Sequence, residues 1–218
     1  MRIVIAGGHG QIALRLERLL AARGDEAAGI IRHAEQSDDL RAVGAEPVLL
    51  DLESASLDEV AQSLRGADAA VFAAGAGPNS GAARKETVDK AAAVLFADAA
   101  VRAGVRRHVV VSAMGADPAH EGDDVFDVYL RAKGEADAYI SGLDALDWTI
   151  LRPGRLTDDP GTGLVRLEAR TGRGEIPRED VAAVIAELVE SPATAGLNLE
   201  LISGPDKVAV AVKSVAGN

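Results

Sequence analysis

Short runs of apolar, mostly β-branched residues recur along the chain, and each is followed by a longer segment whose apolar positions are three or four residues apart. Runs of the first kind are typical of buried strands, and segments of the second kind are typical of amphipathic helices. The predicted strands are Ile3–Ala6, Ala28–Ile31, Pro47–Leu50, Ala69–Ala73, His108–Ser112, Trp148–Arg152 and Leu197–Ile202. The predicted helices are Gln11–Arg23, Gln36–Val43, Leu57–Leu64, Arg84–Ala103, Val125–Ser141 and Arg178–Glu190.

The alternation of strand and helix predicts the fold class. Strands that are apolar on both faces, such as Val109–Val111, belong in a parallel sheet that helices cover on both sides. We therefore expect one domain over residues 1–218, a doubly wound parallel α/β sheet of the Rossmann type. From about 155 to 177, loops rich in Gly, Asp and Thr surround the strand-like stretch Leu164–Ala169. This shift predicts a small annex on the substrate side of the sheet, covering the crevice where ligands bind in such folds.

Composition narrows the class of function. The chain has 23 Lys and Arg against 34 Asp and Glu, a formal charge of −11, which argues against binding to nucleic-acid phosphates. It has no cysteine, and its four histidines lack a metal-ligand spacing, so we expect no metal site. We see neither a signal peptide nor an apolar run of the roughly 20 residues that span a bilayer. We expect a cytoplasmic protein that acts on a small molecule, with neither nucleic acid nor a membrane as a partner.

A glycine-rich loop directly follows the first predicted strand. Its sequence, Gly7-Gly8-His9-Gly10-Gln11-Ile12-Ala13, opens the first predicted helix and matches the pattern GxxGxxA. In a dinucleotide-binding unit Gly7 would make the tight turn, Gly10 would let the backbone approach a pyrophosphate, and Ala13 would keep the helix close to the sheet. The phosphates would lie on free backbone N–H groups of the first helical turn, at Gln11 and Ile12. The alternative is a plain strand-to-helix turn.

The ends of the next strands bear on the choice of cofactor. Arg32 follows the second predicted strand, 19 residues after Ala13, where an NAD-binding protein places an acid that accepts from the ribose. An arginine there could bind a 2′-phosphate, which favours NADP over NAD, although an ordinary surface arginine would look the same. Asp51 and Leu52 could meet the adenine, with Asp51 as a helix cap the alternative.

Small residues follow the fourth predicted strand. Ala73, Ala74 and Gly75 offer a floor on which the nicotinamide ribose could lie, and a tight loop without such a role is the alternative. This completes the set of candidate cofactor contacts that the glycine loop and the strand ends suggest.

Taken together, these segments resemble a known family. They are Gly7-Gly8-His9-Gly10, Asp51-Leu52, Ala73-Ala74-Gly75, Val111-Ser112, Tyr129-Leu130-Arg131-Ala132-Lys133, Leu151-Arg152-Pro153-Gly154 and Ile176-Pro177-Arg178-Glu179-Asp180-Val181-Ala182. The chain resembles the atypical short-chain dehydrogenase/reductases, and more narrowly their compact bacterial NAD(P)H-binding branch, often labelled NAD-dependent epimerase/dehydratase-like. The resemblance covers nearly the whole chain and implies nucleotide binding. That branch contains reductases, isomerases and redox-sensing proteins, so it implies no single activity.

Three residues could carry the chemistry of a reductase. Tyr129 and Lys133 are four residues apart, so both project from one face of the predicted helix Val125–Ser141. A nearby ammonium lowers the pKa of a tyrosine, so Lys133 would make Tyr129 a better acid while also binding the nicotinamide ribose. Ser112, at the end of the fifth predicted strand, could polarise a substrate carbonyl oxygen. The alternative is a chance pair packed in the core, although lysine is scarce here beside arginine.

Three functions remain open at this point. The first is NADPH-dependent reduction of a small-molecule carbonyl, with Tyr129 as the acid, Lys133 as its electrostatic partner and Ser112 as the orienting group. The second is a regulatory protein without catalysis that senses the ratio of NADPH to NADP. The third is an epimerase or dehydratase that uses its cofactor transiently. The helices Arg84–Ala103 and Val125–Ser141 could pair across a homodimer or pack within one subunit.

Overall fold

A computed structural model describes residues 1–77 and 80–217. Along the chain the elements are β1 (Arg2–Ala6), α1 (Gln11–Arg23), β2 (Glu26–Ile31), η1 (Ala34–Gln36), α2 (Ser37–Ala42), β3 (Glu46–Leu49), α3 (Leu57–Leu64), β4 (Ala69–Phe72), α4 (Ala82–Arg84), η2 (Lys85–Ala92), α5 (Ala93–Ala103), β5 (Arg107–Val111), α6 (Val125–Ser141), β6 (Asp147–Pro153), β7 (Arg155–Thr157), β8 (Leu164–Glu168), β9 (Glu175–Pro177), α7 (Arg178–Val189), η3 (Pro192–Thr194), β10 (Leu197–Ser203), β11 (Asp206–Lys207) and α8 (Val208–Ala216).

The central sheet has the strand order β11-β8-β10-β6-β5-β4-β1-β2-β3. Every pair from β10 to β3 is parallel, which confirms the Rossmann-like α/β class. Strands β1 to β3 are added toward one edge of the sheet and β4 to β6 toward the other, so the strand order reverses between the neighbours β1 and β4. Ligands bind at such a switch point, beyond the carboxyl ends of the strands. The fold therefore places a ligand site where the loops after β1 and β4 meet.

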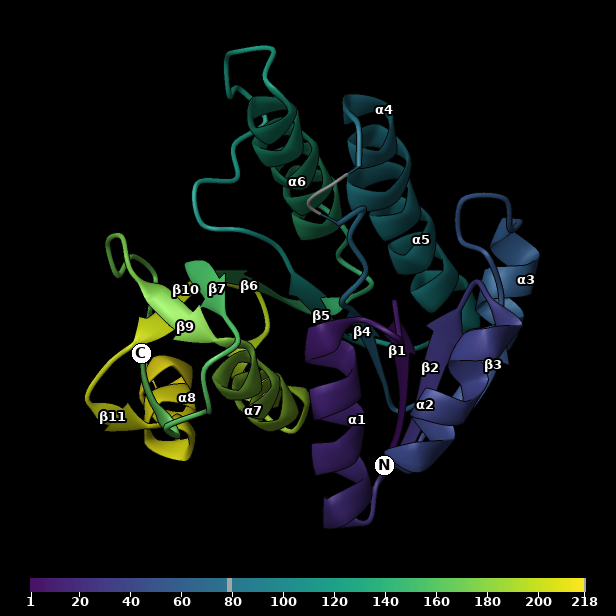
Figure 1. Ribbon diagram of the computed structural model, residues 1–218, viewed down its shortest axis with the longest axis horizontal. Coiled ribbons are helices and arrows are strands. Elements are labelled where there is room, and N and C mark those ends of the chain that lie inside the picture. The colour runs from purple at the N-terminus through teal and green to yellow at the C-terminus, as the bar shows by residue number, and fades with distance from the viewer. Residues whose placement is uncertain (78–79, 218) are drawn as a thin grey trace.

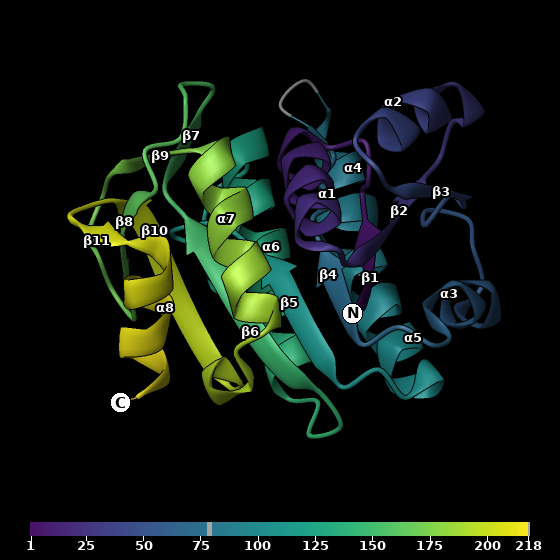
Figure 2. The ribbon, with the colours of Figure 1, turned by 90° about the horizontal axis from the view of Figure 1, so that it is seen from below.

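Helices cover both faces of this sheet, as the two views show (Figures 1 and 2). Helices α1, α7 and α8 lie on one face, over a core that includes Ile3, Val109 and Leu201. Helices α3, α5 and α6 lie on the other face, over a core that includes Val4 and Phe72. Both cores consist mainly of Ala, Val, Leu and Ile, so packing of aliphatic side chains supplies most of the buried apolar area.

Two predictions about the annex need correction. The stretch predicted to leave the sheet contains β8, which joins the main sheet antiparallel to β10, so the sheet is not parallel throughout. Only β7 and β9 form a separate two-stranded sheet, with Leu156 paired to Ile176. The strand-like character of this stretch was predicted, but its place in the main sheet and its direction were not. A strand buried on one face alternates, as Leu164–Glu168 does, and alternation does not reveal direction.

The helical predictions also differ in two places. The segment predicted as one regular helix from Arg84 is divided into α4, a π-helix η2 and α5. Helix α8 was not predicted, because its Val-Ala alternation is also typical of a strand. It is a helix because Val208, Ala211 and Val212, three and four residues apart, share one buried face. Among the described residues, no helix has both the length and the apolar character needed to cross a membrane.

Candidate functional site

The loop between β1 and α1 packs tightly against the loop after β4. Gly7 has a positive φ of 77°, and a Cβ added to it would lie 2.6 Å from the Cα of Ala74, so only glycine fits there. Gly10 is the N-cap of α1, and no described side chain caps that end. The backbone N–H groups of the first turn, including those of Gln11 and Ile12, therefore stay available for an anion.

A cavity of about 220 Å³ opens at this switch point. Pockets that enclose a whole drug-sized ligand measure roughly 300–1,000 Å³, so this cavity suits one end of a dinucleotide. The predicted cofactor residues that line it are Gly7, Gly10, Arg32, Asp51, Leu52, Ala73, Ala74 and Gly75. Lining residues that were not predicted as cofactor contacts include His9, Gln36, Glu53, Arg84, Val88 and Ala92. Gln11, Ile12 and Lys133 do not line it.

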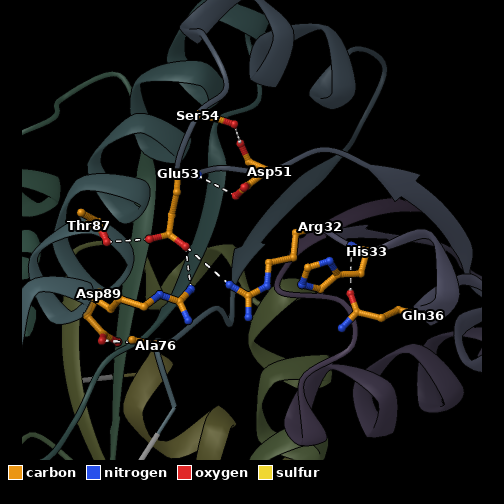
Figure 3. Close-up of polar contacts among 10 residues, drawn as sticks. Arg32, His33, Gln36, Asp51, Glu53, Ser54, Ala76, Thr87 and Asp89 are labelled. Atoms are coloured by element: carbon orange, nitrogen blue, oxygen red, sulfur yellow. Dashed lines mark hydrogen bonds and ion pairs between the residues drawn. The ribbon is translucent and has the colours of Figure 1, made fainter. Parts of the chain in front are cut away.

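An acidic side chain lies beside Arg32, where none was expected. The Glu53 carboxylate is 3.5 Å from Nη1 of Arg32 and accepts from Nη2 of Arg84 at 2.6 Å and from the hydroxyl of Thr87 at 2.7 Å. Figure 3 shows Glu53 between Thr87 and Arg32. The hydrogen bond from Arg84 and that from Thr87 lower the pKa of Glu53, so the carboxylate is ionised at neutral pH. An acid that binds the ribose is expected from the sequence only after β2, whereas Glu53 follows β3.

Asp51 shapes a turn and does not cap a helix. Its Oδ1 accepts from the backbone N–H of Glu53 at 3.0 Å (Figure 3), and its carbonyl accepts from Ser54 and Ala55. The cap of α3 is Ser56, whose hydroxyl accepts from the backbone N–H of Glu59. The alternative that Asp51 caps the helix is therefore wrong, and its contact with adenine stays a prediction.

The predicted Ser-Tyr-Lys residues lie between α6, η2 and the end of β5. Lys133 is buried, with Nζ 3.2 Å from the carbonyl oxygen of Val111 and 3.4 Å from Oδ1 of Asp89. Ser112 is buried one residue beyond β5 and donates to Oδ2 of Asp137 at 2.8 Å. Tyr129 is half-buried, with Nζ of Lys85 5.2 Å from its ring centroid.

The pKa of Tyr129 is raised, contrary to the prediction. Burial is the largest cause, since it disfavours the phenolate. Lys133 lowers the pKa of Tyr129, as predicted, but the carboxylates of Asp89 and Asp137 raise it. Asp89, which is paired with Lys133, therefore offsets part of the effect of the ammonium on the pKa of Tyr129.

Asp137 belongs to the same helix face and was not predicted. It follows Lys133 by four residues, as Lys133 follows Tyr129, so this spacing could have pointed to it. Its Oδ2 accepts from Nε and Nη2 of Arg152, at 3.0 and 2.8 Å. Its Oδ1 is buried without a hydrogen-bond partner among residues 1–77 and 80–217, and burial raises its pKa.

One loop joins the cavity to this cluster. Gly75 lines the cavity, and the next residue, Ala76, donates its backbone N–H to Oδ2 of Asp89 at 3.3 Å. Asp89 in turn holds Lys133. A switch-point cavity, an uncapped helix N-terminus and arginines beside it fit a phosphate-bearing nucleotide. The buried Lys133 and Ser112 and the half-buried Tyr129 lie next to the loop where the other end of a dinucleotide would extend.

These features define a nucleotide-binding Rossmann protein with titratable groups beside the nucleotide site. Comparison with known families identifies it more closely: residues 7–192 match the model of the NAD(P)H-binding family, to which the chain belongs.

Relatives of this family cover the whole chain. The uncharacterized sugar epimerase YhfK of Bacillus subtilis is 34% identical over 216 residues, which span 99% of this chain and 100% of that protein. A Bacillus halodurans structure that carries the name NAD-dependent epimerase/dehydratase has a TM-score of 0.90 at 34% identity and covers 98% of this chain and 99% of its own. The oxidoreductase ylbE of Lactococcus lactis has a TM-score of 0.87 at 28% identity, over 100% and 98%. The names of these relatives are thus those of epimerases or dehydratases and of an oxidoreductase.

Proposed function

We propose that the chain is an NADPH-dependent reductase of a small-molecule carbonyl. The observation that carries this proposal is the juxtaposition of Tyr129, Lys133 and Ser112 around the end of β5, next to the loop that lines the cavity. The bound cofactor would supply the hydride. Gly7, Gly10 and the first turn of α1 would hold its phosphates, and Ala73, Ala74 and Gly75 would support its ribose.

In this proposal Tyr129 donates the proton. Burial keeps its hydroxyl protonated through neutral pH, so the donor form is always present. Transfer of the proton leaves a phenolate, which the ammonium of Lys133 then stabilises. Lys133 is itself held in place by Asp89 and by the carbonyl oxygen of Val111.

Ser112 would bind the substrate oxygen under a condition that the structure defines. Its hydroxyl hydrogen points to Asp137, so it can donate to a substrate only by leaving that carboxylate or when Asp137 is protonated. In the second route Asp137 donates to Ser112 and Ser112 donates to the substrate. Burial raises the pKa of Asp137, in the direction of this route, whereas the ion pair with Arg152 lowers it.

The preference for NADPH is part of the proposal and is supported by Arg32 at the rim of the cavity. Cytoplasmic location and a homodimer remain predictions.

The test of the reductase proposal is Tyr129→Phe. We expect NADPH affinity, measured by titration calorimetry, to change less than about twofold, while turnover falls by at least ~10²-fold because the proton donor is lost. Tyr139→Phe is the matched control, since Tyr139 lies on the same helix, is exposed and hydrogen-bonds Asp98. Turnover is followed as loss of NADPH absorbance over a panel of carbonyl compounds. Equal rates for Tyr129→Phe and wild type would remove Tyr129 from the mechanism.

The names of the relatives favour a second candidate, an epimerase or dehydratase that returns its cofactor unchanged. The same assay separates the two: a reductase consumes one NADPH per product, whereas an epimerase converts its substrate with no net change in NADPH absorbance. A protein that binds NADPH and NADP with very different affinities and turns over nothing would instead be a sensor.

A further inference from the structure

Two arginines from different parts of the chain converge on one carboxylate in the cavity. Arg32 follows β2, Arg84 ends α4 and Glu53 follows β3, and all three line the cavity. Glu53 is hydrogen-bonded to Arg84 at 2.6 Å, while Arg32 is 3.5 Å from the same oxygen, so Arg32 is held less tightly. Thr87 holds the other oxygen of Glu53 at 2.7 Å. Two hydrogen-bond donors, Arg84 and Thr87, and one further guanidinium, that of Arg32, thus surround one carboxylate.

The charges of Arg32, Arg84 and Glu53 do not cancel, since two guanidinium groups and one carboxylate leave a net charge of +1. Without Glu53 between them, the two guanidinium groups carry the two positive charges that match a doubly charged anion. Guanidinium forks bind phosphate as well as carboxylate oxygens. All three side chains keep solvent access, with 44%, 37% and 27% of the side-chain surface of Arg32, Arg84 and Glu53 exposed. An incoming anion can therefore reach both arginines.

We propose that Glu53 occupies the position of a phosphate between Arg32 and Arg84, and that the 2′-phosphate of NADPH displaces it. Arg84 is then a second ligand of the 2′-phosphate, and Glu53 is the residue that sets the preference between the phosphorylated and unphosphorylated cofactors. This inference rests on the proposed preference for NADPH. The carboxylate competes with the phosphate, so it lowers affinity for NADPH while keeping the arginines aimed into the cavity.

A different role for Glu53 makes the opposite prediction. If the carboxylate stays in place and accepts hydrogen bonds from the ribose hydroxyls, removing its charge weakens every adenine nucleotide and most of all the unphosphorylated ones. Under our proposal, removing the charge strengthens binding of the phosphorylated nucleotide alone.

The probes are 2′,5′-ADP and 5′-AMP, which differ only in the 2′-phosphate, titrated calorimetrically into the full chain. We expect Glu53→Gln to raise affinity for 2′,5′-ADP by about fivefold, the size of a partly exposed charge interaction, and to leave 5′-AMP unchanged. We expect Arg84→Gln to lower affinity for 2′,5′-ADP by at least ~10-fold, the loss of a charged hydrogen bond, with 5′-AMP again unchanged. Arg84→Lys keeps the charge without the fork and should lie between wild type and Arg84→Gln.

Arg102→Gln is the matched control, because Arg102 also pairs with an acid, Asp58, but lies away from the cavity. Thermal melts of every variant check that the fold is retained. A drop in affinity for both probes with Glu53→Gln would overturn the displacement of Glu53, and an unchanged ratio with Arg84→Gln would overturn the role of Arg84. Wild-type protein that prefers 2′,5′-ADP while the variants keep the same ratio refutes this inference alone. Wild-type protein that binds neither probe, or both equally, refutes the proposed NADPH preference as well.

Discussion

Glu17 on α1 is a carboxylic acid buried in the core with nothing to neutralise it. Its side chain is fully buried, and neither oxygen has a hydrogen-bond partner among the residues that the structure describes. It occupies space that two glycines leave open, since a Cβ on Gly29 would lie 2.4 Å from its Oε1 and one on Gly8 would lie 3.1 Å away. Burial raises the pKa of Glu17 from 4.5 to about 8.

This shift makes stability depend on pH with a defined sign. Between pH 4.5 and about 8 the unfolded chain has released a proton that the folded protein still holds, so the free energy of unfolding falls as the pH rises. One pKa unit is worth about 1.4 kcal/mol, so the loss by pH 7 is about 3 kcal/mol. Glutamine has the shape of the protonated acid and no proton to release. We therefore expect the free energy of unfolding of Glu17→Gln, relative to that of wild type, to rise by about 3 kcal/mol from pH 4.5 to pH 7.

The assay is urea unfolding followed by the fluorescence of Trp148, the only tryptophan, at a series of pH values from 4.5 to 8. The informative quantity is the difference between variant and wild type, because every other titrating group cancels from it. Glu46→Gln, at an exposed position on β3, is the control for loss of a charge and should show no such trend. A difference that stays constant with pH would refute the reasoning, since Glu17 would then be ionised and stabilised in the folded protein.

Two further predictions concern backbone conformation and a buried cation. Gly7→Ala should abolish measurable dinucleotide binding in calorimetry, because its Cβ meets the backbone at Ala74, while Gly104→Ala, with similar φ but open space, should cost only about 1 kcal/mol in a thermal melt. Arg107→Met should lower the free energy of unfolding by about 3 kcal/mol, because it removes the two charged hydrogen bonds that Arg107 donates to the carbonyl of Leu188 and the hydroxyl of Thr194, at 2.6 and 2.9 Å. Since Arg107 begins β5, at the end of the strand away from the cavity, nucleotide affinity should not change, and a change would show that the two ends are coupled.

Most of the fold could be predicted from the sequence, because the Ala, Val, Leu and Ile residues of the core recur at different intervals in strands and in helices. Helices α1, α3 and α6 begin and end at the predicted residues. The π-helix η2 could not be predicted, because its apolar spacing continues that of α5. Nor could the direction of β8, since direction depends on which edge of the sheet the chain reaches.

The candidate site was predictable where residues lie next to one another in sequence, as in the glycine loop. It was not predictable where separate elements supply the partners. Glu53 faces Arg32 only because β2 and β3 are adjacent, and Asp89 reaches Lys133 only because η2 packs on α6. Burial is the largest cause of the raised pKa of Tyr129, and Asp89 and Asp137 add to it, so reasoning from Lys133 alone gave the wrong direction.

The two hydrophobic cores, one under each layer of helices, need different lengths of the chain before all of their residues are present. Every buried member of the core under α3, α5 and α6 lies between Val4 and Ile150, whereas the core under α1, α7 and α8 extends to Val212. Ribosomes add about 5–20 residues per second, so the second core waits roughly 3 to 12 seconds longer for its last residues. Until α7 (Arg178–Val189), which packs against α1, has been synthesised, the nascent chain displays part of the apolar face of α1 to chaperones and to other chains. The helix that opens with the phosphate-binding loop is among the first synthesised and among the last to be covered.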